Sequence, residues 1–171
     1  LIRWNYLPTQ AESNMTPMTH NLTAIALAVA VFAVLPTHDA AEIGFGCLLG
    51  ARAPDWLEIA KYNRMTDRRW SLIPHRTITH WPWLWMLLLI LTAPPVLYGS
   101  QGALGATGLT IGCLLHIGMD YLTPMGVPLG ISPFGERSSL KWVRTGSADE
   151  VLVNLTAFIL AGVFWSIAAV F

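Results

Sequence analysis

Long apolar stretches alternate with short polar connections along this chain, and their lengths predict its architecture. Three stretches, residues 81–99, 103–122 and 151–171, approach the length of about twenty residues that crosses about 30 Å of hydrocarbon. A fourth stretch, residues 21–35, is shorter, but it is uncharged and rich in alanine and valine, so it can cross if it lies nearly straight. The fifth, residues 41–53, is short enough to be either a crossing or a buried re-entrant helix.

We therefore expect an all-α fold, a polytopic bundle of four to five membrane helices that forms a single domain over residues 19–171. Residues 1–18 are polar and mixed in character, without a positive segment that runs into an apolar core. This pattern indicates a poorly ordered extension rather than a cleaved signal peptide, and Met15 or Met18 is a candidate for the natural start.

The composition agrees with a membrane protein. The chain is 54% hydrophobic and only 12% charged, whereas an ordinary soluble domain has about 25% charged residues. Its formal net charge is zero, so nothing predicts a nucleic-acid partner. We expect membrane lipids as partners and a small-molecule or lipid substrate, and the sequence leaves the oligomeric state open.

Basic residues gather in two of the connections, and this asymmetry predicts the orientation. Short loops rich in lysine and arginine stay on the cytoplasmic side of a membrane. The connections at residues 36–40 and 98–102 contain neither residue type and belong on the opposite side. We predict an integral protein of the bacterial inner membrane. Its cytoplasmic connections carry Lys61, Arg64, Arg68, Arg69 and Arg76 before the third span, and Arg137, Lys141 and Arg144 before the last.

If residues 41–53 cross, nearly all the unusual polar residues fall at the cytoplasmic ends of the helices. Ionisable residues inside a membrane are costly, so each one is a candidate for a functional site. His38 lies in an opposite connection and is excluded. The candidates are His20, Asp55, His75, His80, His116, Asp120 and Glu150.

The clearest pair is His116 and Asp120, which are four residues apart and therefore stack on one helix face. Alternatively, the two side chains hydrogen-bond each other and help to hold neighbouring helices together. His75 and His80 cannot share a helix face, so we place His75 in the loop and His80 at the helix start. Glu150 ends a capping-box pattern that begins at Ser147, and the sequence leaves helix capping and metal ligation equally open for it.

Imidazoles and carboxylates without thiolates suit zinc, manganese, iron or nickel better than calcium or magnesium. We expect zinc first, with manganese as the alternative, and the number of candidate ligands allows one or two ions. Cys47 and Cys113 lie in apolar stretches and are expected to be packing residues. We expect Asp55 and Arg76 to act in catalysis, with Arg76 neutralising charge on an oxyanion. The alternative role of Arg76 is to anchor lipid headgroups.

Five motifs carry a resemblance: "MTHN", "APDWLE", "HRTITH", "LLHIGMDYLTPMGVPL" and "GSADE". Together they resemble the YdjM-type membrane-bound metal-dependent hydrolases, some of which are regulated by LexA. The resemblance implies that the same polar residues form a metal site, namely His20, Asp55, His75, His80, His116 and Asp120. It implies Glu150 less securely. The family often has Pro-Asp-hydrophobic-Asp-His where this chain has Pro54 to Glu58, so the second acid and the histidine of that motif are absent. Whether Glu58 substitutes, and how many metals bind, stays open.

These observations predict a hydrolase at the cytoplasmic leaflet that uses a metal-activated water on a lipid-associated ester or phosphodiester. Residues 123–135, rich in proline and glycine, are expected to fold over the site as a lid. Two alternatives stay open. One is a transporter or proton relay, which requires polar residues through the whole membrane, and the other is a non-catalytic subunit with a structural metal.

Overall fold

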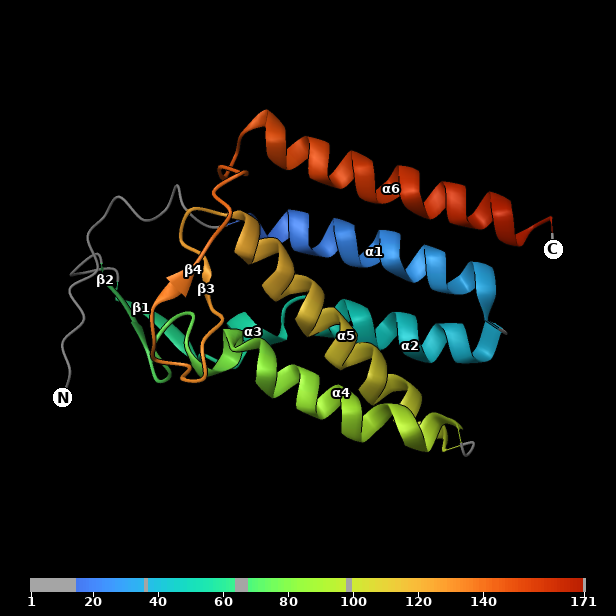
Figure 1. Cartoon of the computed structure of the whole chain (residues 1–171), viewed down its shortest axis with the longest axis horizontal. Coiled ribbons are helices and arrows are strands. Elements are labelled where there is room, and N and C mark those ends of the chain that lie inside the picture. Colours follow the sequence, from blue (N-terminus) through green and yellow to red (C-terminus); the bar gives the residue numbers. More distant parts are fainter. Residues whose placement is uncertain (1–14, 36, 64–67, 98–99, 171) are drawn as a thin grey trace.

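The computed structural model describes residues 15–35, 37–63, 68–97 and 100–170, and for residues 60–63, 68–70, 97 and 101 it describes the backbone alone. Figure 1 shows the long helices running side by side, with α6 against α1, and α2 and α4 beside α5. The helices are α1 (Pro17–Val34), α2 (Thr37–Gly50), the short α3 (Ala53–Trp56), α4 (Pro82–Leu97), α5 (Gln101–Leu122) and α6 (Ala148–Ala168), with a 3₁₀ turn at Ile78–His80.

Three of these helices, α1, α5 and α6, are long and apolar enough to cross a membrane. Helices α2 and α4 are shorter, with 14 and 16 residues, so the predicted four to five spans are not confirmed. Most side chains of α6 are exposed and apolar, as expected for a surface that faces lipid. Pro94 and Pro95 lie in the last turns of α4, which ends at Leu97.

Helix α1 begins at Pro17, two residues before residue 19, which was the expected start of the domain. Thr16 caps α1 by accepting a hydrogen bond from the Thr19 amide, and Pro17 begins the helix. Met15 is buried with Met119 and Val143. The expectation for residues 1–14 falls outside the described residues.

Glycines make the contact between α2 and α5 very close. A Cβ atom at Gly46 or Gly50 would overlap the backbone of α5, and one at Gly108 or Gly112 would overlap the backbone of α2. Small residues four apart on facing helices allow this backbone approach in membrane proteins. The contact holds the carbonyl end of α2 against the part of α5 that carries His116.

Two short hairpins modify the expected all-α fold. Strands β1 (Ala60–Asn63) and β2 (Arg68–Ser71) pair antiparallel before the 3₁₀ turn. Strands β3 (Val127–Pro128) and β4 (Arg137–Ser138) pair in the predicted lid. Cys47 and Cys113 are free and buried, which confirms them as packing residues. Cys113 packs with Trp85, Ile117 and Val127 in the core beside the lid.

Candidate metal centre

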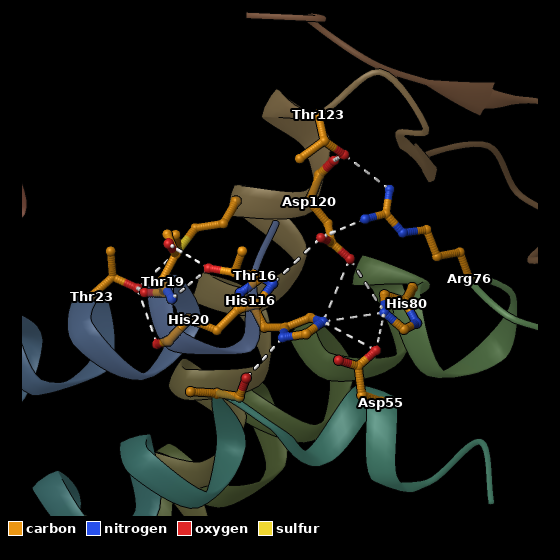
Figure 2. A network of polar contacts seen from close by, with 12 residues as sticks. Thr16, Thr19, His20, Thr23, Asp55, Arg76, His80, His116, Asp120 and Thr123 are labelled. Carbon is orange, nitrogen blue, oxygen red and sulfur yellow. Dashed lines mark hydrogen bonds and ion pairs between the residues drawn. The ribbon is translucent and has the colours of Figure 1, made fainter. Parts of the chain in front are cut away.

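The polar residues meet at one end of the bundle, where α1 and α4 begin and α2 and α5 end (Figure 1). Figure 2 shows His20 from α1, Asp55 from α3, His80 from the 3₁₀ turn, and His116 and Asp120 from α5 directed toward one another. Apart from Asp55, these side chains are almost completely buried. The structure thus brings together five of the seven predicted ligands.

Five distances among four ligand atoms are close to those of a tetrahedral site. His80 Nε2 lies 3.2 Å from His116 Nε2, 3.4 Å from Asp120 Oδ2 and 3.6 Å from Asp55 Oδ1. His116 Nε2 lies 3.5 Å from Asp120 Oδ2 and 3.9 Å from Asp55 Oδ1. Zinc bonds of about 2.0–2.1 Å in a tetrahedron give edges of about 3.3–3.4 Å. We call these four residues the cage.

Hydrogen bonds outside the cage determine which nitrogen of each ring faces inward. His116 Nδ1 lies 2.8 Å from the carbonyl oxygen of Ala51, which can only accept, so this nitrogen carries the proton. His80 Nδ1 lies 3.2 Å from the Glu58 carboxylate and takes the same role. Both Nε2 atoms therefore face each other and two carboxylate oxygens. A cation among them, either a proton on His80 or a metal ion, would balance this buried set.

The charges of the residues in the connections agree with this requirement. Burial alone would lower the pKa of His80, but hydrogen bonds to Asp120, Asp55 and Glu58 raise it to about 10. Burial would raise the pKa of Glu58, but His75 and His80 bring it down to about 2. The pKa of Asp55 is also lowered, against burial, by His80 and His116. These shifts keep the Asp55 and Glu58 carboxylates ionised and a proton on His80, which a metal ion would replace.

Glu58 is the functional residue that the sequence left open. It is fully buried, and its two oxygens lie 2.8 and 2.7 Å from His75 Nδ1. It also accepts a hydrogen bond of 3.0 Å from the Arg76 amide. Glu58 therefore fixes the ring of His80 from behind, as outer carboxylates do for metal-bound histidines. The sequence signal was an acid one helical turn after Asp55.

His75 lies with Glu58 rather than between His80 and His116. Ligand atoms of Asp55, Glu58, His75 and His80 lie within 4.8 Å of one another, and so do those of His20, His116 and Asp120. Because His80 Nε2 and Asp55 Oδ1 also face the second group, the two groups meet at the cage. His75 lies outside the cage, next to Glu58.

Arg76 and His20 both contact the second oxygen of Asp120. The Arg76 guanidinium forms an ion pair with Asp120 Oδ1 and donates to Thr123 Oγ1 and the Gly126 carbonyl oxygen at 3.1 and 2.8 Å. Arg76 therefore contacts both Asp120 and the start of the lid, and its predicted role in catalysis stays a prediction. His20 Nε2 lies 3.5 Å from Asp120 Oδ1, and its ring stacks on His116 with centroids 3.9 Å apart.

Glu150 lies apart from the cage. Its carboxylate accepts hydrogen bonds from the amide and hydroxyl of Thr16 at 2.6 and 2.7 Å and from the Gly146 amide at 2.7 Å. These bonds tie the beginning of α1 to the beginning of α6. Ser147 is the N-cap residue as expected, but its hydroxyl donates to the Arg144 carbonyl oxygen and does not cap the helix. Of the two roles that the sequence left open, this geometry favours capping.

Asp55 is the one cage residue whose side chain is partly exposed. Its side chain is 31% exposed, whereas those of His80, His116 and Asp120 are 3% exposed or less. Asp55 stands in a four-residue helix that Pro54 begins. Solvent or substrate can therefore approach the cage on the side of α3.

Comparison with known proteins gives one result. The family model of the YdjM inner membrane protein matches residues 15–171, which include the whole cage and all six helices. No curated protein and no solved structure matches the chain. The match agrees with the motif resemblance and with the apolar helices. The chain belongs to the YdjM inner membrane protein family.

Proposed function

We propose that this chain is a membrane-embedded metal-dependent hydrolase that acts on a lipid-associated ester or phosphodiester at the cytoplasmic leaflet. The observation that carries the proposal is the cage, in which two imidazole nitrogens lie 3.2 Å apart and each lies 3.4–3.9 Å from two carboxylate oxygens, with Asp55 partly exposed. Buried charges of this kind are costly unless they bind an ion or take part in chemistry.

Asp55, His80, His116 and Asp120 would hold one divalent metal, and their tetrahedral spacing favours zinc over manganese, which prefers octahedral oxygen ligands. When bound, such a metal acts as a Lewis acid and provides an activated water at neutral pH. Glu58 and the Ala51 carbonyl orient the two histidines. Arg76 and His20 hold Asp120 by its other oxygen, so that Oδ2 stays directed at the cage.

The position of the cage suggests the substrate. It lies at the ends of α1 and α5, both of which can cross the membrane, beside connections that carry the basic residues. These connections belong on the cytoplasmic side by the charge rule. Phospholipid headgroups and their ester bonds lie at this depth, so a lipid substrate can reach Asp55 from the leaflet.

A second candidate is a non-catalytic subunit with a structural metal. Four protein ligands are typical of structural zinc, whereas catalytic zinc usually has three and an open position. The exposure of Asp55 favours the hydrolase, because this ligand borders solvent. Transport has less support, because the buried ionisable residues of the described chain all lie at the cage end of the bundle. They are His20, Glu58, His75, Arg76, His80, His116, Asp120 and Glu150.

The test is lipid turnover in nanodiscs that contain the metal-loaded protein, with products identified by mass spectrometry. Zinc-loaded protein should release a headgroup or an acyl chain, whereas chelated protein and the His116→Ala variant should not, and zinc should restore the chelated sample. Stoichiometric metal without any turnover over a broad set of membrane lipids would support the structural subunit. Protein that binds no transition metal would contradict both candidates.

A further inference from the structure

The tip of the predicted lid carries apolar side chains that the protein does not cover. Ile131 is 96% exposed and Phe134 is 65% exposed, and Leu129 is also exposed. The loop around them is well fixed, because β3 and β4 pair on either side of the tip and Val127 is buried in the core. These side chains are therefore displayed by an ordered hairpin.

Two tryptophans attach this hairpin to the beginning of α4. Trp81 Nε1 donates to the Gly130 carbonyl oxygen and Trp83 Nε1 donates to the Leu129 carbonyl oxygen, each at 2.9 Å. Tryptophan is enriched at membrane interfaces, where its indole lies at headgroup level. The tip thus lies beside two tryptophans of the kind that favour a membrane interface.

Apolar side chains are also exposed on α4, the helix whose beginning the tryptophans bond to the tip. Leu87, Ile90 and Leu91 are exposed on this helix. Helix α4 packs along α5, which is long and apolar enough to cross a membrane, so these side chains are candidates to face lipid.

We propose that the hairpin tip, Leu129 to Phe134, inserts into the cytoplasmic leaflet at the boundary between headgroups and acyl chains. Its occupant is the lipid bilayer, and the proposal needs neither a metal nor hydrolysis. Insertion removes Ile131 and Phe134 from water, which stabilises apolar side chains. The hairpin is bonded on both sides to the segment with His75 and Arg76, through Arg137 of β4 to the His75 carbonyl oxygen and through Arg76 to Gly126. Lipid contact at the tip would therefore hold the lid in place beside the cage.

The test is fluorescence quenching of a nitrobenzoxadiazole probe in nanodiscs with one protein copy each. The probe is attached to Ile131→Cys or Phe134→Cys, and the matched control is Asp149→Cys, an exposed polar position at the beginning of α6. Unsubstituted protein serves as the labelling blank, because Cys47 and Cys113 are buried. Circular dichroism verifies that each labelled protein keeps its helices.

Probes at 131 and 134 should show blue-shifted emission and be quenched by lipids that carry a nitroxide near the headgroup. The probe at 149 should be quenched several-fold better by aqueous iodide. Equal iodide quenching at all three positions would overturn the proposal. A blue shift at 131 and 134 without lipid quenching would also overturn it, because protein rather than lipid would then cover the tip.

Discussion

Among the residues that the structure describes, two groups with a histidine between carboxylates lie at opposite ends of the bundle. At the far end, His38 Nδ1 lies 3.1 Å from Asp39 Oδ1 and His38 Nε2 lies 3.5 Å from Glu42 Oε1. At the other end, His80 lies 3.2–3.6 Å from Glu58, Asp120 and Asp55. The distances are similar, but the His38 side chain is 63% exposed and that of His80 is completely buried.

The difference shows what makes the second group a candidate metal centre. His38 and its partners are neighbours on one helix and remain in contact with water, so the group costs little and needs no ion. The cage joins α3, the 3₁₀ turn and α5, and it buries carboxylates among imidazole lone pairs. Burial makes that group costly, and Arg76, a proton on His80 or a bound metal ion would offset the cost, so the two groups should respond very differently to substitution.

Removal of a cage ligand should have the largest effect. His116→Ala or Asp120→Ala should eliminate stoichiometric metal, with a loss of affinity beyond the about 10–100-fold that outer partners cost. His38→Ala should leave metal content unchanged. Metal analysis of the purified proteins, with circular dichroism to verify the helices, gives the comparison. Full metal retention in both cage variants would refute the cage.

Arg76→Met should be the most destabilising change outside the ligands. It leaves the Asp120 carboxylate buried without its ion pair, and breaking a buried pair costs about 3–5 kcal/mol. Arg144→Met, at an exposed position, should change the free energy of unfolding by about 0.5 kcal/mol or less. Thermal unfolding in the same detergent measures both, and equal stability of the two variants would show that Arg76 is not a structural support.

Gly112→Ala should weaken the support behind His116. The new methyl group overlaps the backbone at Cys47, and overpacking of this kind costs about 1–3 kcal/mol. Gly118→Ala on the same helix meets no atoms and is the matched control. A Gly112→Ala protein as stable as the Gly118→Ala protein would mean that α2 and α5 are not in backbone contact.

Glu58→Gln should lower metal affinity by about 10–100-fold, because an amide orients His80 less well than a carboxylate. The absorption spectrum of the cobalt-substituted protein should also shift as the geometry at His80 relaxes. Glu58→Asp should recover part of the affinity. An unchanged spectrum and unchanged affinity in the amide variant would exclude Glu58 as a positioning residue.

Glu150→Gln should have the smallest effect. The amide keeps only one of the two acceptor oxygens, so stability should fall by about 0.5–1.5 kcal/mol through weaker bonds to Thr16 and Gly146. Metal content should not change. A loss of metal in this variant would reassign Glu150 from helix capping to ligation.

The sequence predicted the residues whose relation is local. His116 and Asp120 were found as a pair because a helix places residues four apart on one face. Glu58 could not be assigned in this way, since only the turn back through β1 and β2 brings it beside His75 and His80. Glu150 was ambiguous because its role depends on Thr16, which lies at the other end of the chain. The spacing within the cage could not be predicted either, because it depends on the close glycine contact between α2 and α5.

The central claim is that one metal ion is held by Asp55, His80, His116 and Asp120. X-ray absorption spectroscopy of the purified metal-loaded protein tests it most directly. Zinc in the cage predicts about four nitrogen and oxygen neighbours at about 2.0–2.1 Å, together with the outer-shell scattering of two imidazoles. Protein without bound metal, or a metal whose shell contains no imidazole, would contradict the account.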